Sequence, residues 1–125
     1  MNLRIVIAGS RDFKDYDFLK EKMFPIISRL RIKGYNVIIV SGKANGADTL
    51  GEKFAEELGL DIEEYPADWD RYQKSAGFIR NEQMAKVAHL VVVFWDGKSE
   101  GTKHMMNLAV KHKKKLRVFK FKLNK

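Results

Sequence analysis

Three glycine-containing segments of this 125-residue chain combine a flexible backbone with side chains that can bind an anion. The first is Gly9-Ser10-Arg11, the second runs from Ser41 to Asp48 (SGKANGAD), and the third runs from Asp96 to Thr102 (DGKSEGT). Glycines allow the backbone to approach a ligand closely, and the free amides at a helix start favour negative charge. The three segments therefore predict a site for phosphate or a similar anion.

The candidate ligand-binding residues of these segments carry hydroxyl, amide, carboxyl or guanidinium groups, or are small. One of them, Asp48, can contact a ribose or base, or can instead complement the dipole of the helix that it opens. The segments match neither GxxxxGK[ST] nor GxGxxG, which disfavours a Walker-type NTPase and an ordinary dinucleotide dehydrogenase. The candidates are Gly9, Ser10, Arg11, Ser41, Gly42, Asn45, Gly46, Ala47, Asp48, Asp96, Gly97, Ser99, Gly101 and Thr102.

Two further candidates lie outside the glycine segments. Arg80 falls one turn into an expected helix, where its guanidinium could hold a phosphate through two hydrogen bonds. The alternative for Arg80 is a surface ion pair with Glu82 or Asp70. Trp69 lies in the polar stretch before that helix and could stack on a base or pack against its own domain.

Histidine and cysteine usage bears on metal binding. His89, His104 and His112 lack the spacing of metal ligands, and the chain has no cysteine. We therefore expect no metal site, although Mg²⁺ could arrive with a phosphate ligand.

The hydrophobic pattern alternates between strand-like and helix-like segments. It predicts one domain with the α/β fold class, a doubly wound, Rossmann-like sheet of about five mainly parallel strands. Pro25 is expected to interrupt and kink the first helix. Strands are expected at 3–8, 36–41, 60–65, 89–95 and 116–122, helices between Asp15 and Gly34 and at 47–58, 75–88 and 100–113, and a loop at 66–74.

The expected strand order is 3-2-1-4-5, with the flavodoxin-like order as the other candidate. In the first order, strands one and four are neighbours at the switch point where open α/β sheets bind ligands. The loops after strands one, two and four would then meet at one edge of the sheet. This convergence joins the three glycine segments into one predicted crevice.

Composition favours a globular, cytoplasmic protein without a membrane span. Apolar residues make up 45% and charged residues 32% of the chain. The longest apolar run, Leu90 to Trp95, is far shorter than the ~20 residues that a membrane helix needs.

The net charge of +8 comes from the C-terminal segment 111–125, which contains eight Lys or Arg and no acid. Lys111 and 113–115 could close the last helix, and Lys120 and Lys122 could protect an edge strand. The other interpretation is an electrostatic surface for nucleic acid. The first 110 residues are neutral, which favours the structural interpretation.

Four motifs along the chain resemble those of the SLOG superfamily, and more narrowly its YspA-related subgroup. The resemblance implies a Rossmann-like domain that binds a nucleotide or nucleotide-derived ligand at the glycine loops, and it adds Asn81 to the candidates. The motifs are Gly9-Ser10-Arg11, Ser41-Gly-x-Ala44-x-Gly46-Ala-Asp48, Ala76-Gly77-x-x-Arg80-Asn81-x-x-Met84 and Trp95-Asp96-Gly97-x-Ser99-x-Gly101-Thr102.

The same superfamily includes the Lonely Guy phosphoribohydrolases and the DNA-processing protein A family, which binds single-stranded DNA. The phosphoribohydrolases have Arg-Lys where this chain has Arg80-Asn81, and their catalytic Glu corresponds to Met105. A thioether cannot replace a catalytic carboxylate. We therefore predict a binding or sensing module. The alternatives are an N-glycosidase-type nucleotide hydrolase, with Arg80 the best catalytic candidate, and a single-stranded nucleic-acid-binding protein. Self-association is left open.

Overall fold

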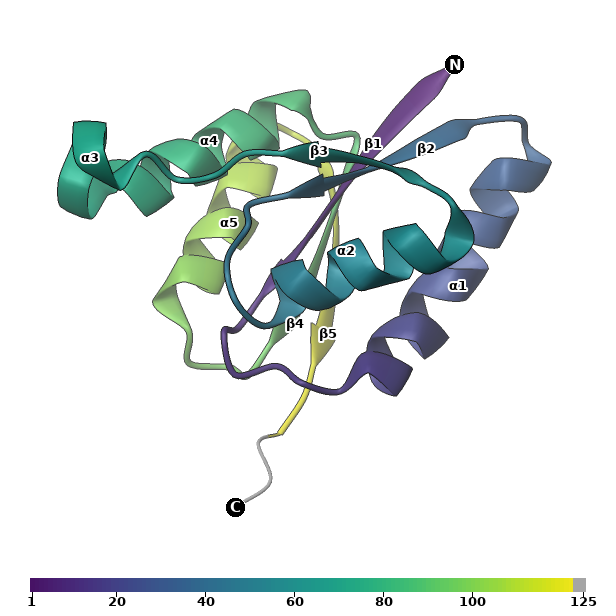
Figure 1. Cartoon of the computed structure of the whole chain (residues 1–125), viewed down its shortest axis with the longest axis horizontal. Coiled ribbons are helices and arrows are strands. Elements are labelled where there is room, and N and C mark those ends of the chain that lie inside the picture. The colour runs from purple at the N-terminus through teal and green to yellow at the C-terminus, as the bar shows by residue number, and fades with distance from the viewer. Residues whose placement is uncertain (123–125) are drawn as a thin grey trace.

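The computed structural model describes residues 1–122, in which strands and helices alternate along the chain (Figure 1). A short 3₁₀ turn, Gln73–Ser75, joins two of the helices. The strands are β1 (Asn2–Gly9), β2 (Asn36–Ser41), β3 (Asp61–Glu64), β4 (Leu90–Trp95) and β5 (Lys115–Lys120). The helices are α1 (Tyr16–Ile32), α2 (Ala47–Leu58), α3 (Trp69–Tyr72), α4 (Ala76–Val87) and α5 (Glu100–Lys111).

All five strands form one parallel sheet in the order β3-β2-β1-β4-β5. This result confirms the α/β fold class and the strand order expected from the sequence. β1 lies in the middle of the sheet, and its last residue, Gly9, pairs with Phe94 of β4. The loops that follow β1 and β4 are therefore neighbours at the carboxyl ends of the strands.

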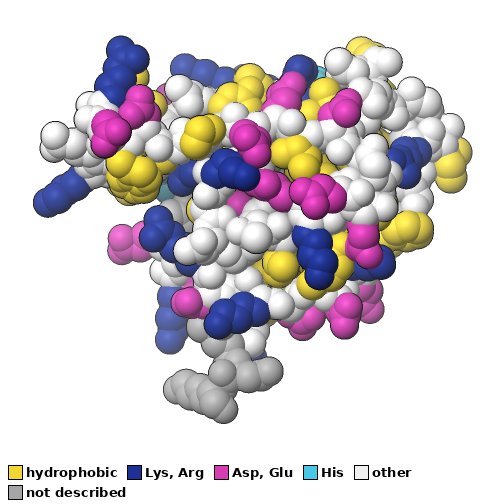
Figure 2. Space-filling view, in the orientation of Figure 1, with side chains coloured by type: hydrophobic (Ala, Val, Ile, Leu, Met, Phe, Trp, Pro, Cys, Tyr) yellow, Lys and Arg dark blue, Asp and Glu magenta, His cyan; other side chains and the backbone are white. Residues whose placement is uncertain are grey.

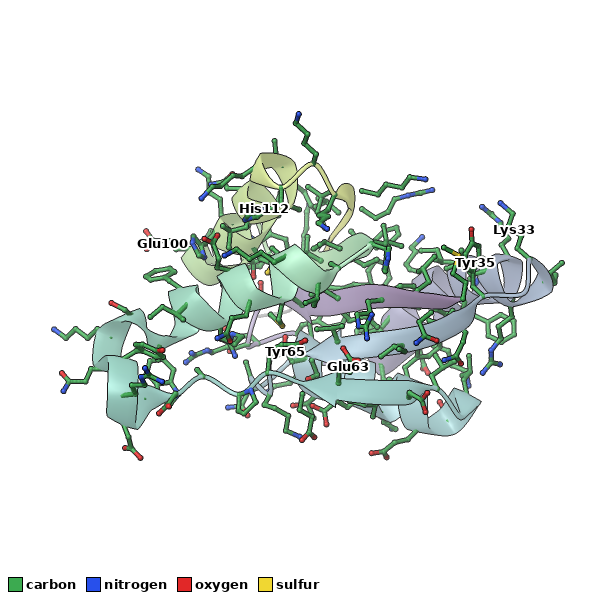
Figure 3. All side chains as sticks on the ribbon, turned by 90° about the horizontal axis from the view of Figure 1, so that it is seen from above. Lys33, Tyr35, Glu63, Tyr65, Glu100 and His112 are labelled. Atoms are coloured by element: carbon green, nitrogen blue, oxygen red, sulfur yellow. The ribbon has the colours of Figure 1, made fainter. Side chains whose placement is uncertain are left out.

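Helices cover both faces of the sheet, α1 and α2 on one side and α4 and α5 on the other (Figures 1 and 3). Successive side chains of a strand point to opposite faces, so β1 sends Ile5 to the α1 side and Val6 to the α5 side. Leu19 of α1 packs in the first core and Met105 of α5 in the second. The apolar side chains that recur along each helix thus pack against the apolar side chains of the strands, and this packing fixes the helices on the two faces of the sheet.

Three expectations about local structure are wrong in detail. The expected interruption at Pro25 does not occur, because α1 continues through it; a proline removes one helical hydrogen bond and leaves the others in place. The expected loop at 66–74 contains the short helix α3, which the Asp68 side chain caps by accepting a hydrogen bond from the amide of Arg71 at 3.1 Å.

The third difference concerns the lysines at 113–115, which do not extend the last helix. α5 ends at Lys111, Lys113 has a positive φ of 59°, and Lys115 is already the first residue of β5. β5 is an edge strand as expected, but it ends at Lys120. Lys122 therefore follows the strand, and residues 123–125 lie outside the described part of the chain.

Charge is unevenly distributed between the two edges of the sheet. Residues 47–64, which include α2 and the edge strand β3, contain seven acids and one lysine, and Figure 2 shows acidic side chains gathered in this region. Residues 111–122, which include the other edge strand β5, contain seven Lys or Arg and no acid. No helix among the described residues is long and apolar enough to cross a membrane.

Candidate functional site

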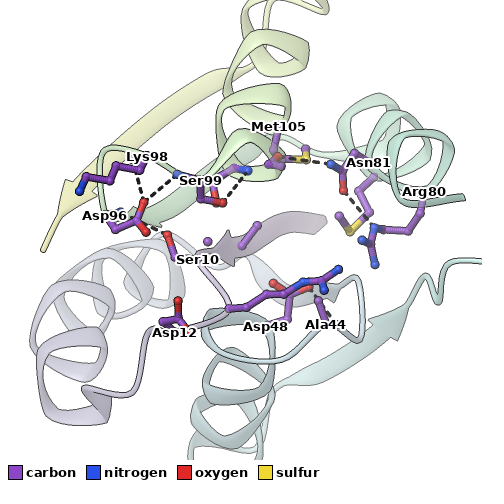
Figure 4. A pocket seen from close by; sticks show the side chains of 16 residues that line it. Ser10, Asp12, Ala44, Asp48, Arg80, Asn81, Asp96, Lys98, Ser99 and Met105 are labelled. Carbon is purple, nitrogen blue, oxygen red and sulfur yellow. Dashed lines mark hydrogen bonds between the residues drawn. The ribbon is translucent and has the colours of Figure 1, made fainter. Parts of the chain in front are cut away.

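A cavity of about 460 Å³ lies at the carboxyl ends of β1 and β4 (Figure 4). Residues of the glycine segments meet here with residues of α4. The predicted residues that line it are Gly9, Ser10, Arg11, Asp48, Arg80, Asn81, Asp96, Ser99, Gly101 and Thr102. Six further residues that were not among the predicted ligand-binding candidates also line it, namely Ala8, Asp12, Ala44, Met84, Lys98 and Met105.

A second cavity of about 440 Å³ adjoins the first and shares Arg11, Ala44 and Arg80 with it. Its wall includes the indole of Trp69, which is 52% exposed. Gly42 and Asn45 line this second cavity as well, together with Lys43, Pro66 and Ala67, which the sequence analysis did not select. The two cavities therefore lie side by side and share one wall, and together they are called the crevice below.

Four of the predicted residues lie outside both cavities and shape the loops instead. The Ser41 hydroxyl donates to Glu52 at 2.6 Å. Gly46 has φ +81°, and a Cβ there would collide with the carbonyl oxygen of Ser10. The amide of Ala47 donates to that same carbonyl at 3.5 Å, so this helix-start amide is used within the protein. Gly97 adopts φ +88° in its turn.

Ser10 connects the loop after β1 to the loop after β4. Its amide donates to the carbonyl of Phe94 at 3.0 Å, and its hydroxyl accepts from the amide of Asp96 at 3.2 Å. Gly9 permits this contact, because a Cβ at that position would collide with the Phe94 carbonyl. The floor of the first cavity is therefore held by protein contacts before any ligand enters.

Asp96 and Ser99 organise the third glycine segment. One oxygen of Asp96 accepts from the amides of Lys98 and Ser99, both at 2.8 Å. Burial of this carboxyl opposes ionisation, but the amide hydrogen bonds outweigh burial and lower its pKa. The Ser99 hydroxyl caps α5 by accepting from the amide of Thr102 at 3.4 Å. Both side chains therefore have a structural role in the cavity wall.

Asp48 is the buried carboxylate of the site, with only 4% of its surface exposed. Burial raises its pKa to about 6, against a hydrogen bond from the Ala44 amide at 3.4 Å and the charge of Arg80. A carboxyl that titrates so close to neutrality in a cavity is typical of functional sites.

Arg80 is buried beside this carboxylate and spans the two cavities. Its Nε donates to Asn81 at 3.0 Å, and its Nη1 donates to the carbonyl of Gly42. The alternative of an ion pair with Glu82 or Asp70 is wrong, because Glu82 lies against Lys111 and His112 instead. Burial lowers the pKa of Arg80, Asp48 raises it, and the charge of Arg11 lowers it again.

Asn81 links α4 to α5 at the side of the first cavity. Its Nδ2 lies 3.5 Å from the carbonyl of Gly101, to which it donates, and 3.3 Å from Nδ1 of His104. Met105, which the motif resemblance aligns with the catalytic Glu of the phosphoribohydrolases, lines the same cavity and is only 1% exposed. This part of the cavity wall is therefore apolar.

Two sequence comparisons give the relationship of the chain to known proteins. A sequence model of the YspA, cpYpsA-related SLOG family matches residues 3–72. The chain belongs to this SLOG family. A relative, Gene 61 protein of Mycobacterium phage D29, is 32% identical over 114 residues, which cover 86% of this chain and 89% of that protein.

Solved structures support the same fold for the SLOG chain. DNA processing protein A from Streptococcus pneumoniae superposes with a TM-score of 0.67 at 20% identity, over 94% of this chain and 50% of that one. DNA processing protein A from Helicobacter pylori, which binds single-stranded DNA, superposes with a TM-score of 0.63 at 24% identity, over 98% of this chain and 67% of that one. The SLOG chain thus spans half the length of the first protein and about two-thirds of the second, and the likeness shows a shared fold.

Proposed function

We propose that this SLOG chain binds a nucleotide or nucleotide-derived ligand across the two adjoining cavities. The observation that carries the proposal is the shared wall, which contributes the guanidinium groups of Arg11 and Arg80 to both cavities. The charge of Arg11 lowers the pKa of Arg80, so the two cations repel one another there. A phosphate between them would relieve this repulsion and accept charge-assisted hydrogen bonds from both.

The side chains around this phosphate position suit the rest of a nucleotide. Trp69, half exposed in the second cavity, offers a flat surface for a base. Asp48, in the first cavity, is an acceptor for ribose hydroxyls. The described residues contain no cluster of three side chains able to hold a metal ion, so Mg²⁺ would enter with the phosphate that it accompanies.

The carboxylates of the site favour binding over hydrolysis of the N-glycosidic bond. Met105 removes the carboxylate that the related hydrolases use, and Asp96 is engaged by the amides of its own loop. Arg80 stays protonated and can stabilise negative charge, but it cannot serve as the general acid that a leaving base requires. We therefore propose a nucleotide sensor or binding module and not a hydrolase.

A ligand panel tests this function. AMP, ADP, ATP, NAD and ADP-ribose are each added to the protein, with melting temperature and chromatographic analysis of the products as readouts. A ligand at a hundred times its Kd stabilises the folded state by ~2.7 kcal/mol, which shifts melting by several degrees. Stabilisation without turnover supports the proposal. Release of free base would establish a hydrolase, and the absence of any shift would exclude these ligands.

Single-stranded DNA binding is the second candidate function. It is favoured by the fold that the chain shares with the Helicobacter pylori DNA processing protein A, and by the seven Lys or Arg of residues 111–122. Binding through phosphates depends steeply on salt, which separates it from binding of a single nucleotide.

A further inference from the structure

A third cavity, of about 560 Å³, lies at the end of the sheet opposite to the nucleotide crevice. It is a groove between the last turns of α1 and the first residues of β5, at the amino ends of β1 and β4. Its floor consists of aliphatic side chains, each only partly buried, which leaves apolar surface open to water. These are Leu3, Ile26, Leu30 and Leu90.

The rim of this groove is strongly cationic. No Asp or Glu is among the lining residues, and within residues 1–122 none of the rim cations forms an ion pair. Lys114 donates to the carbonyl of Lys86 at 3.2 Å, which leaves its charge uncompensated. The rim cations are Arg29, Lys33, Lys113, Lys114, Lys115 and Arg117.

The arrangement of the sheet explains why the groove is open. Lys115, Arg117 and Phe119 share one face of β5 because side chains alternate along a strand. Phe119 packs in the α1-side core, stacked on Phe94 with the ring centroids 5.5 Å apart, so aromatic residues cover the carboxyl half of this face. Lys115 and Arg117 are exposed in the other half, where they line the groove beside the last turns of α1. Parallel sheets normally carry helices on both faces, and here a stretch of one face lacks such a cover.

We propose that this groove binds an acidic amphipathic helix of a partner protein. The aliphatic floor would receive the apolar face of the helix, and the rim cations would meet carboxylates along its edges. Single-stranded nucleic acid fits less well, because its bases bind by stacking on aromatic side chains and the described lining has none apart from the imidazole of His89.

A second copy of the chain is a weaker occupant, although its opposite edge is acidic. Several of those acids are already paired within the molecule. Glu63 binds Arg4 at 2.8 Å, and Lys43 bridges Glu52 and Glu64 at 2.9 Å each. Offering these carboxylates to another copy would require breaking existing pairs, whereas a separate acidic helix carries no such cost.

The test uses a fluorescent helical peptide of about 18 residues, roughly five turns, with Leu at i, i+3, i+4 and i+7 and Glu elsewhere. Its scrambled isomer has the same charge and composition without the apolar face. Anisotropy at ~150 mM salt should give a Kd on the order of 10 µM for the patterned peptide and at least about tenfold weaker binding for the isomer. Equal affinity of the two peptides, or no binding of the patterned one below about 1 mM, would overturn the proposal.

Protein variants locate the interaction. Replacing Lys113, Lys115 and Arg117 together by Gln should weaken peptide binding about tenfold, because three screened charge pairs are lost. The matched control replaces the exposed Lys14, Lys74 and Lys103 by Gln and should change the Kd less than about twofold. Equal effects of the two triple variants, with melting temperatures showing both folded, would refute this location.

Two further measurements distinguish other occupants. Oligo-dT or anionic vesicles that bind the groove more tightly than the patterned peptide, and lose affinity in the groove variant, would replace the proposal by a nucleic acid or a lipid surface. Sedimentation of the protein alone is the second measurement. A concentration-dependent oligomer that the groove variant abolishes would assign the groove to a second copy of the chain.

Discussion

The close approach of Gly42 to Arg80 makes the shared wall of the two cavities sensitive to a single methyl group. A Cβ on Gly42 would lie 2.8 Å from Nη1 of Arg80 and 2.9 Å from Oδ2 of Asp48. Both distances are too short for ordinary contact, so one of the charged groups must move. The arrangement of cation and carboxylate therefore depends on the absence of a side chain at position 42.

Gly42→Ala should consequently weaken nucleotide binding, by roughly tenfold, while lowering stability by only about 1–2 kcal/mol. Titration calorimetry and urea unfolding measure the two effects. Gly77→Ala is the matched control, since its Cβ would lie 3.6 Å from Nη2 of the same Arg80, an ordinary contact. Equal losses of affinity in both variants would mean that the position of Arg80 does not govern binding.

The ionisation of Asp48 links the site to stability. Its pKa is raised from 3.8 to about 6, so between these values the unfolded chain releases the proton while the folded protein retains it. The free energy of unfolding must then fall as pH rises through this window. At pH 7 the buried charge costs roughly 3 kcal/mol, a cost that fits a group retained for binding.

Asp48→Asn should remove this pH-dependent cost. We expect the variant to gain stability relative to the wild type as pH rises from about 4 to 7, in unfolding titrations across that range. Asp96→Asn should behave oppositely. The pKa of Asp96 is lowered in the folded protein. Its carboxylate therefore stabilises the fold at pH values above the ordinary pKa of an aspartate, and this contribution is lost as the pH falls through the lowered pKa. A pH-independent difference between Asp48→Asn and the wild type would contradict the burial argument.

At the scale of elements, two serines that precede helices provide a further comparison. Ser99 caps α5 through the amide of Thr102, whereas Ser75 precedes α4 without any side-chain hydrogen bond to it. Ser99→Ala should therefore lower the free energy of unfolding by about 1 kcal/mol, and Ser75→Ala should leave it nearly unchanged. Thermal or urea unfolding of both variants decides the point, and a loss of similar size in each would show that capping is not the cause.

Much of this layout follows from the sequence because hydrophobic periodicity is a property of whole elements. β2 coincides with the expected 36–41 and α2 with 47–58, since each has a clear apolar pattern with glycine at a boundary. α3 has no buried residue and depends on one capping side chain, so periodicity gives no signal for it. The lysines at 113–115 are equally compatible with a helix end and a turn, and the turn is what forms.

The candidate site was predictable to the extent that it follows from topology. Parallel strands end at one edge of the sheet, so Ser10, Asp48 and Asp96 could be expected together. Which loop residues face inward depends on backbone angles that the sequence does not specify, and Gly46 and Ala47 accordingly lie outside the cavities. Apolar lining such as Met84 carries no chemical signal of its own.

At the scale of the whole molecule, the two ends of the sheet have different surfaces. The carboxyl ends combine Arg11 and Arg80 with the buried Asp48, in a crevice sized for one small ligand. The amino ends carry the uncompensated cations at the start of β5. A nucleotide and a macromolecular polyanion would therefore bind at separate places, and mutations at one place should leave the other unaffected.

Salt dependence separates these two kinds of binding. A single-stranded DNA that contacts the cations of β5 through its phosphates should lose affinity with a log-log slope near −0.7 per phosphate contacted. Because no aromatic side chain apart from the imidazole of His89 lines the groove at the start of β5, we expect no measurable binding of oligo-dT at ~150 mM salt, whereas a nucleotide should still bind. Arg11→Ala and Arg80→Ala should weaken nucleotide binding, and replacing 113–115 by Gln should not. Anisotropy titrations at several salt concentrations measure both ligands. Sub-micromolar affinity for oligo-dT at ~150 mM salt, tighter than the ~10⁻⁴–10⁻⁶ M of non-specific contact, would make single-stranded DNA the ligand of this protein instead.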